Sequence, residues 1–118
     1  MIIKKNQRKK EKISGKGIIY DYPVKSKKMG FSVQELDERT PGRIPERGEY
    51  KNKICNEICY VISGKGSVFI NNKKINISEG DIYFVKPNQK SFLIAKKIKI
   101  LTITKPDWYK EQCEVVGK

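Results

Sequence analysis

The sequence predicts an all-β domain, a barrel or sandwich of short strands. Turn signals rich in glycine, proline and asparagine recur roughly every 8–12 residues. The segments between them are rich in isoleucine, valine, phenylalanine and tyrosine, and no helical periodicity is sustained between residues 14 and 104. A chain of 118 residues is one ordinary domain and can bury a core without a disulfide or a metal.

The elements before residue 50 are a strand, a second strand and a loop. Residues 17–24 are apolar, aromatic and ended by a proline, which suits an edge strand or an arm packed on the barrel. Residues 31–36 largely alternate apolar and polar side chains, which indicates a half-buried strand. Residues 40–48 hold two prolines and two glycines and are therefore predicted to be a loop.

The second half of the chain repeats a rhythm of strand and turn. Strands are predicted at 54–62, 67–70, 73–77, 82–85, 91–95 and 98–104. The breaks between them include a glycine turn at 63–66, an Asn71-Asn72 hairpin turn and a charged Lys96-Lys97 pair. After the last strand, Pro106 and Asp107 are typical of the first turn of a short helix.

Charge is concentrated at the N-terminus and scattered elsewhere. The net charge is +13, and residues 1–12 hold six basic residues against one acidic residue, so we expect a basic, flexible arm over 1–12 and a single domain over 13–118 with a short C-terminal helical tail. Neither a helix with a basic face nor an aromatic RNA-binding signature is visible in the sequence. A solvated, lysine-rich surface is therefore favoured over nucleic-acid binding.

Residue types exclude several classes of site. The sequence contains no histidine, which excludes Ser-His-Asp and Cys-His catalytic sets. Its three cysteines, an odd number, predict free thiols in a reducing compartment, and we expect a cytoplasmic protein. Apolar runs are too short for a membrane span or a secretory signal, and no phosphate-binding glycine loop is present.

Two glycine motifs stand out in the second half of the chain. Glu57 is followed after six residues by Gly64, within the string Tyr60-Val61-Ile62-Ser63-Gly64, and a Gly80-Asp81 turn is followed by Pro87. These motifs resemble those of the cupin superfamily. The resemblance covers roughly residues 42–104. It implies a cupin-like double-stranded β-helix, a jelly-roll barrel, and also a homodimer, for which the strand at 17–22 is a plausible exchanged or edge-pairing element.

The resemblance also locates the place where cupins hold a metal. Metal-binding members typically bind iron, manganese, nickel or zinc through three histidines and a glutamate. Here the first two histidine positions fall, depending on the spacer, at Lys51 and Lys53 or at Tyr50 and Asn52. The third falls at Phe92, so only Glu57 remains as a ligand, and we expect no metal and no cofactor.

The candidate ligand-binding residues surround Glu57. If Glu57 points inward, strand alternation places Cys55, Cys59 and Val61 on the same face. The set is Lys51, Lys53, Cys55, Glu57 and Phe92. An inward Lys53 would attract a carboxylate or phosphate, although a shift of one residue would turn it to solvent. The cysteines are expected in the core rather than as reactive thiols, and Phe92, Tyr83 and Trp108 either line an apolar pocket or pack in the core.

Three functions follow from these residues. The preferred interpretation is a non-catalytic protein that binds a small anionic or sugar-like molecule in the barrel without metal. The alternative is a metal-independent isomerase or epimerase-like enzyme, with Glu57 and a lysine as acid and base. The second alternative is a basic accessory module for nucleic acid or protein.

Overall fold

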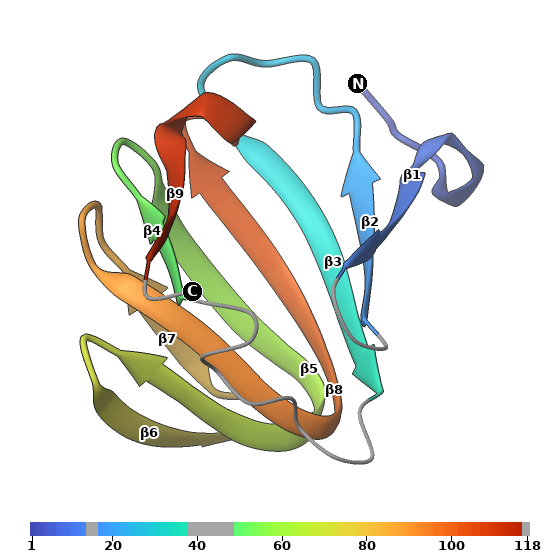
Figure 1. The fold of residues 1–118 in the computed structure, drawn as a ribbon. Helices are drawn as coiled ribbons and strands as arrows, with labels where there is room; N and C mark the ends of the chain where they lie inside the picture. The colour runs from blue at the N-terminus through green and yellow to red at the C-terminus, as the bar shows by residue number, and fades with distance from the viewer. Residues whose placement is uncertain (14–16, 38–48, 117–118) are drawn as a thin grey trace.

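A computed structural model describes residues 1–13, 17–37 and 49–116, and it confirms the all-β fold class. The described residues form one antiparallel sheet that curls into a barrel (Figure 1). The loop predicted at 40–48 lies outside the described residues. In the described part of the chain, no helix is long and apolar enough to cross a membrane.

Nine strands make up the described sheet. They are β1 Lys9–Ile13, β2 Gly17–Tyr22, β3 Gly30–Asp37, β4 Glu49–Asn52, β5 Asn56–Ile70, β6 Lys73–Ser78, β7 Ile82–Val85, β8 Lys90–Lys105 and β9 Cys113–Val116. The strand order is β1-β2-β3-β8-β4-β9, and β5 pairs with β6, β7 and β8. Figure 1 shows β5 and β8 crossing the whole barrel as its two longest ribbons.

The sequence-based prediction of two separate strands in place of each long strand was wrong. Residues 54–62 and 67–70 belong mainly to the single strand β5, and residues 91–95 and 98–104 belong to β8. The predicted breaks lie opposite each other, since Lys65 pairs with Lys97, and the β5–β8 register shifts between Val61 and Ser63 and between Lys65 and Ser67. Bulges of this kind bend a strand without reversing it, which is how these two strands follow the barrel wall.

The tight turns and the shorter strands agree with the sequence. Asn71 and Asn72 both have positive φ, at 48° and 69°, as a two-residue hairpin turn requires. The strands predicted at 31–36, 73–77 and 82–85 are confirmed as β3, β6 and β7. Local signals sufficed there because turn residues and period-two alternation are properties of neighbouring residues.

Both ends of the chain differ from the sequence-based expectation. Residues 9–12 of the expected flexible arm belong to β1, which pairs with β2 over five residues, so β2 lies between two strands rather than at an edge. Long charged side chains are compatible with β1 because edge strands commonly carry them. The expected helical tail is a single 3₁₀ turn, Lys110–Gln112, followed by β9, which pairs with β4.

The hydrophobic core fills one part of the barrel. It is a cluster from β3, β5, β6 and β8: Leu36, Cys59, Val61, Val68, Ile77, Ala95, Ile98 and Ile100. Gly66 of β5 lies so close to β8 that a Cβ atom there would be 2.7 Å from the carbonyl oxygen of Ile94. The rest of the barrel interior is lined by mixed polar and aromatic side chains and encloses the candidate site.

Candidate functional site

A cavity of about 600 Å³ lies inside the curled sheet. Eight strands and the segment before β9 contribute to its wall, because side chains alternate inward and outward along each strand. The inward residues of β3, for example, include Ser32 and Gln34, and those of β8 include Thr102 and Thr104. The cavity therefore offers many hydrogen-bonding groups at fixed positions.

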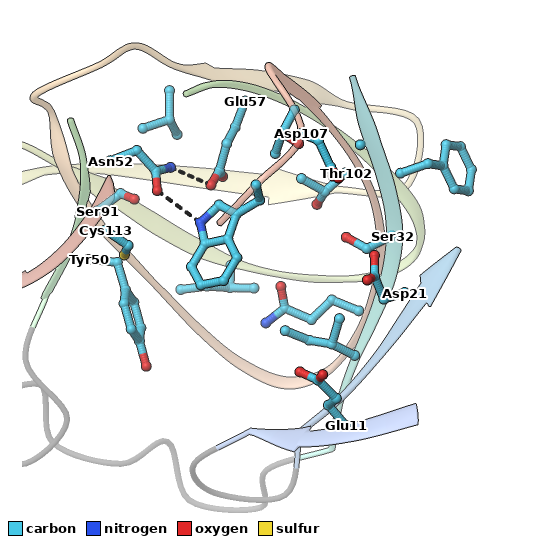
Figure 2. Close-up of a pocket in the computed structure, with 18 of the residues that line it drawn as sticks. Glu11, Asp21, Ser32, Tyr50, Asn52, Glu57, Ser91, Thr102, Asp107 and Cys113 are labelled. Carbon is cyan, nitrogen blue, oxygen red and sulfur yellow. Dashed lines mark hydrogen bonds between the residues drawn. The ribbon is translucent and has the colours of Figure 1, made fainter. Parts of the chain in front are cut away.

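Glu57 and Asn52 form the polar centre of this cavity. Glu57 points inward from β5, between Val85 of β7 and Thr104 of β8. The side-chain Nδ2 of Asn52, at the end of β4, donates a hydrogen bond of 2.6 Å to Oε1 of Glu57. Figure 2 shows these two side chains pointing toward one another.

The segment before β9 holds Asn52 in place. The indole Nε1 of Trp108 and the side-chain Nε2 of Gln112 both donate to Oδ1 of Asn52, at 3.1 and 2.8 Å. Gln112 is buried, and its own Oε1 accepts the backbone N–H groups of Ile54 and Cys55 at 3.2 and 3.1 Å. The chain before β9 is thus hydrogen-bonded to the strand ends that carry the site.

Burial controls the acidity of Glu57. Desolvation raises the pKa of its carboxyl above the ordinary value, and the hydrogen bond from Asn52 lowers it in part. The neighbouring Cys59 is also desolvated, which raises its pKa to about 11, and burial raises the pKa of Tyr83 well above its ordinary value. Cys59 and Tyr83 are therefore neutral at physiological pH.

The charge of the cavity contrasts with the charge of the chain. Four carboxylic acids line it, namely Glu11, Asp21, Glu57 and Asp107, and Lys110 is the one basic residue among its lining residues in the described part of the chain. Burial, with the nearby charges of Asp107 and Glu11, raises the pKa of Asp21, and Lys9 opposes this shift. In Figure 2, Glu11 and Asp21 lie across the cavity from Asn52.

Aromatic side chains supply much of the remaining wall. Tyr50, Tyr83, Phe92 and Trp108 all line the cavity, and Phe92 stacks on Phe69 with ring centroids 4.4 Å apart and planes 15° apart. Stacking of this kind fixes the orientation of a ring. The cavity therefore combines flat apolar surfaces with directed hydrogen-bonding groups, as ligand sites usually do.

The structure separates the five sequence-predicted site residues into two groups. Glu57 and Phe92 line the cavity, whereas Lys51, Lys53 and Cys55 are not among the residues that line it. Tyr50 and Asn52 occupy the inward positions of β4, so Lys51 takes the opposite side of the strand, and Lys53 is exposed beyond its end. The expectation that Lys53 points inward was therefore wrong by one residue.

Cys55 is a core residue rather than a site residue. It is fully buried, and its Sγ lies 3.5 Å from the carbonyl oxygen of Pro106. Sequence reasoning also missed several residues that do line the cavity, among them Ser32, Gln34 and Asp21. The signal for Ser32 and Gln34 was the alternation of residues 31–36, which reveals two faces but does not say which face borders the interior.

The residues at the expected metal position do not fit a transition metal. They are Tyr50, Asn52, Glu57 and Phe92, and the Asn52 amide already donates to the carboxylate. One carboxylate beside an amide and a phenyl ring does not provide the nitrogen and sulfur donors that such ions select. No group of three or more His, Cys, Asp or Glu side chains that could hold a metal occurs within residues 1–13, 17–37 and 49–116.

Comparison with known proteins finds a family and several solved structures to which this chain is similar. The AraC-like ligand binding domain family matches residues 56–97. The solved structure of Pac13 from Streptomyces, described as a nucleoside dehydratase, superposes with a TM-score of 0.86 at 15% sequence identity, covering 98% of this chain and 90% of that one. A Pac13 variant with uridine has a TM-score of 0.85, also at 15% identity, covering 98% of this chain and 89% of that one.

Other solved structures share the fold with lower TM-scores. KdgF from Halomonas has a TM-score of 0.75 at 12% identity, covering 92% of this chain and 94% of that one. Salicylate 1,2-dioxygenase from Pseudoaminobacter salicylatoxidans has a TM-score of 0.74 at 13% identity, with 91% of this chain and 31% of that one covered. A comparison with curated protein sequences finds no significant match.

Proposed function

Because this chain is a cupin-fold protein, we propose that it binds a small, uncharged, hydroxylated molecule inside its barrel without a metal. One observation carries the proposal: a cavity of about 600 Å³ combines aromatic walls with the Glu57–Asn52 pair and further polar groups. A ring that carries hydroxyl groups matches such a wall, since its faces can pack on aromatic side chains while its hydroxyls donate and accept hydrogen bonds.

The charges of the cavity favour a sugar-like ligand over an anion. Four carboxyl groups line the cavity, and the lysines expected to bind an anion, Lys51 and Lys53, are not among the lining residues. A phosphate or carboxylate would enter a field of the same sign, which disfavours binding. The uridine in the Pac13 structure supports the proposal, because a nucleoside contains a neutral sugar ring, although that protein is only 15% identical.

Binding is tested with matched pairs of compounds. Neutral sugars and nucleosides, each beside its phosphorylated counterpart, are screened by thermal shift and then by isothermal titration calorimetry. We expect the neutral member of at least one pair to bind and its phosphate to bind more weakly. Phe92→Ala should weaken binding about 10-fold or more by removing an aromatic wall, whereas Phe84→Ala, on the outer surface, should not. Tighter binding of the phosphates would contradict the proposal.

A metal-independent enzyme is the second candidate, and the position of Glu57 favours it. A buried carboxyl with a raised pKa, facing a cavity, is the usual form of a general acid or base. The sequence suggested Lys51 or Lys53 as the partner of Glu57, but neither lysine is among the residues that line the cavity. If a bound sugar is epimerised or dehydrated, Glu57→Gln should reduce turnover about 100-fold or more with little change in affinity. Equal turnover in both proteins would remove this candidate.

A further inference from the structure

A series of one-way hydrogen bonds fixes the orientation of the Asn52 amide. The backbone N–H groups of Ile54 and Cys55 can only donate, so the side-chain atom of Gln112 that they meet must be Oε1. The Nε2 of Gln112 then faces Asn52. The indole N–H of Trp108 is also a donor only, so both groups meet Oδ1 of Asn52, at 2.8 and 3.1 Å. The amide group of Asn52 must therefore present its NH₂ to Glu57.

This orientation has a consequence for the two oxygens of Glu57. Oε1 accepts the 2.6 Å hydrogen bond from Asn52, so it is an acceptor whether or not the carboxyl is ionised. A proton on Glu57 therefore resides on Oε2. Among the described residues, no protein group forms a hydrogen bond with Oε2, and the Glu57 side chain lines the cavity.

Building on the proposed binding function, we propose that Trp108 and Gln112 are positioning residues that act on Glu57 through Asn52. They keep the Asn52 amide from turning over, and so leave Oε2 of Glu57 as the oxygen that meets the ligand. Oε2 donates a hydrogen bond when Glu57 is protonated, and it accepts one when Glu57 is ionised. A ligand hydroxyl satisfies both states, because it can accept and donate.

Burial raises the pKa of Glu57, and the hydrogen bond from Asn52 at the end of this series opposes that effect. The titratable neighbours are Cys55 just before β5, Cys59 on β5, Tyr83 on β7 and Cys113 on β9. Burial raises the pKa of each. All four are neutral near pH 7 as a result. On β8 the facing residue is Thr104, and in the segment before β9 the carboxyl of Asp107 lines the same cavity.

The experiment follows the titration of Glu57 itself and needs no ligand. Full-length protein carrying ¹³C-labelled glutamate side chains is titrated by NMR, with Glu57→Gln used to assign the signal. In a Trp108→Phe/Gln112→Met double variant, the freed amide can turn its oxygen toward the protonated acid and stabilise it. We expect the pKa of Glu57 to rise, although neither substituted side chain has a hydrogen bond to Glu57.

Two further variants test the proposal even if the double variant does not fold. Trp108→Phe alone removes one donor from a side chain that is 46% exposed, so its fold should persist, and it should raise the pKa by a smaller amount. Tyr109→Phe changes a cavity-lining neighbour without touching the series, and should leave the pKa unchanged. An unchanged pKa of Glu57 in the folded Trp108→Phe protein would overturn the proposal, whether or not the ligand screen finds a binder.

Discussion

Gly64 of β5 lies directly against the main-chain carbonyl of Lys97 of β8, and a Cβ atom at residue 64 would collide with that oxygen. Gly64 also has a φ of +86°, which side-chain-bearing residues rarely adopt. Two independent penalties therefore apply to Gly64→Ala, and we expect it to reduce the free energy of unfolding by about 2–4 kcal/mol. Urea denaturation measures this loss.

Gly80 provides a matched control for that experiment. Its φ is +89°, almost the same as that of Gly64, but no atom beyond its two neighbours in the chain lies within 4 Å of where its Cβ would be. Gly80→Ala should therefore cost only about 1 kcal/mol, from backbone strain alone. If the two variants lost equal stability, close approach of the two long strands would not be what requires glycine at residue 64.

Gln112 is a position where a single side chain supports several parts of the fold. It is 2% exposed and forms three hydrogen bonds, to Asn52 and to the backbone of Ile54 and Cys55. Gln112→Ala leaves the buried N–H of Cys55 without its acceptor, so we expect a loss of about 2–4 kcal/mol in the free energy of unfolding. Glu111→Ala, at an exposed neighbouring position, should change it by less than about 0.5 kcal/mol. Equal losses in urea denaturation would refute the assignment.

The strand rhythm was predictable from the sequence, and the long strands were not. Tight turns such as Asn71-Asn72 depend on local conformational preferences, which the sequence displays directly. The glycines near residue 64 have the same composition as a turn but act as a bend within β5. Only the pairing with β8, about 30 residues away in the chain, distinguishes these two outcomes.

The site was predictable in its centre and not in its surroundings. Glu57 lines the cavity, as the resemblance implied, but Asn52 rather than Lys53 meets it, because one residue of register reverses the face of a strand. The bond between Gln112 and Asn52 joins residues 60 positions apart. No local pattern encodes such a contact, so the support of the site by the segment before β9 emerges only in three dimensions.

The raised pKa of Glu57 makes stability depend on pH in a predictable direction. The folded state holds the proton more tightly than the unfolded state, whose carboxyl titrates near 4.5. The stabilisation is therefore complete below that pH, and it is lost as the pH rises through the higher folded-state value. The exposed Glu79 offers a control position at the surface.

We expect wild-type stability to fall relative to that of Glu57→Gln as the pH is raised from about 4 to about 8. Urea denaturation across this range gives the difference, and Glu79→Gln should show the same profile as the wild type. A wild type that gained stability relative to Glu57→Gln over this range would mean that the folded-state pKa is lowered, against the effect of burial.

The three cysteines should react with a thiol reagent at very different rates. Cys55 and Cys59 are 0% and 2% exposed, whereas Cys113 is half-buried and lines the cavity. We expect one thiol to react with Ellman's reagent in the folded protein, more slowly than a free thiol because burial raises its pKa, and two to react only on unfolding. Cys113→Ser should abolish the fast phase. Two fast thiols in the wild type would contradict the burial of Cys55 and Cys59.

The outer surface of the barrel bears an apolar face that we expect to pair with a second copy of the chain. Its members are 37–63% exposed and come from β5, β7 and β8: Ile58, Tyr60, Ile82, Phe84 and Ile103. They are neighbours across the sheet, because Ile58 pairs with both Phe84 and Ile103, and Tyr60 pairs with Ile82. At about 200 Å² for each fully exposed side chain, their exposed area is on the order of 450 Å².

That area is typical of the largest apolar patch on a monomer, which is often an interaction site, and it is roughly half of what each partner buries in a standard interface. A two-fold axis through the face would bring the same apolar side chains together from both copies, and the face itself contains no lysine. An Ile82→Lys/Phe84→Ser double variant should therefore be monomeric in sedimentation equilibrium where the wild type is dimeric. Ile54→Ser, at a residue that is 52% exposed elsewhere, should remain dimeric. A wild type that sediments as a monomer would refute self-association, and a dimer that survives the double variant would place the interface on another face.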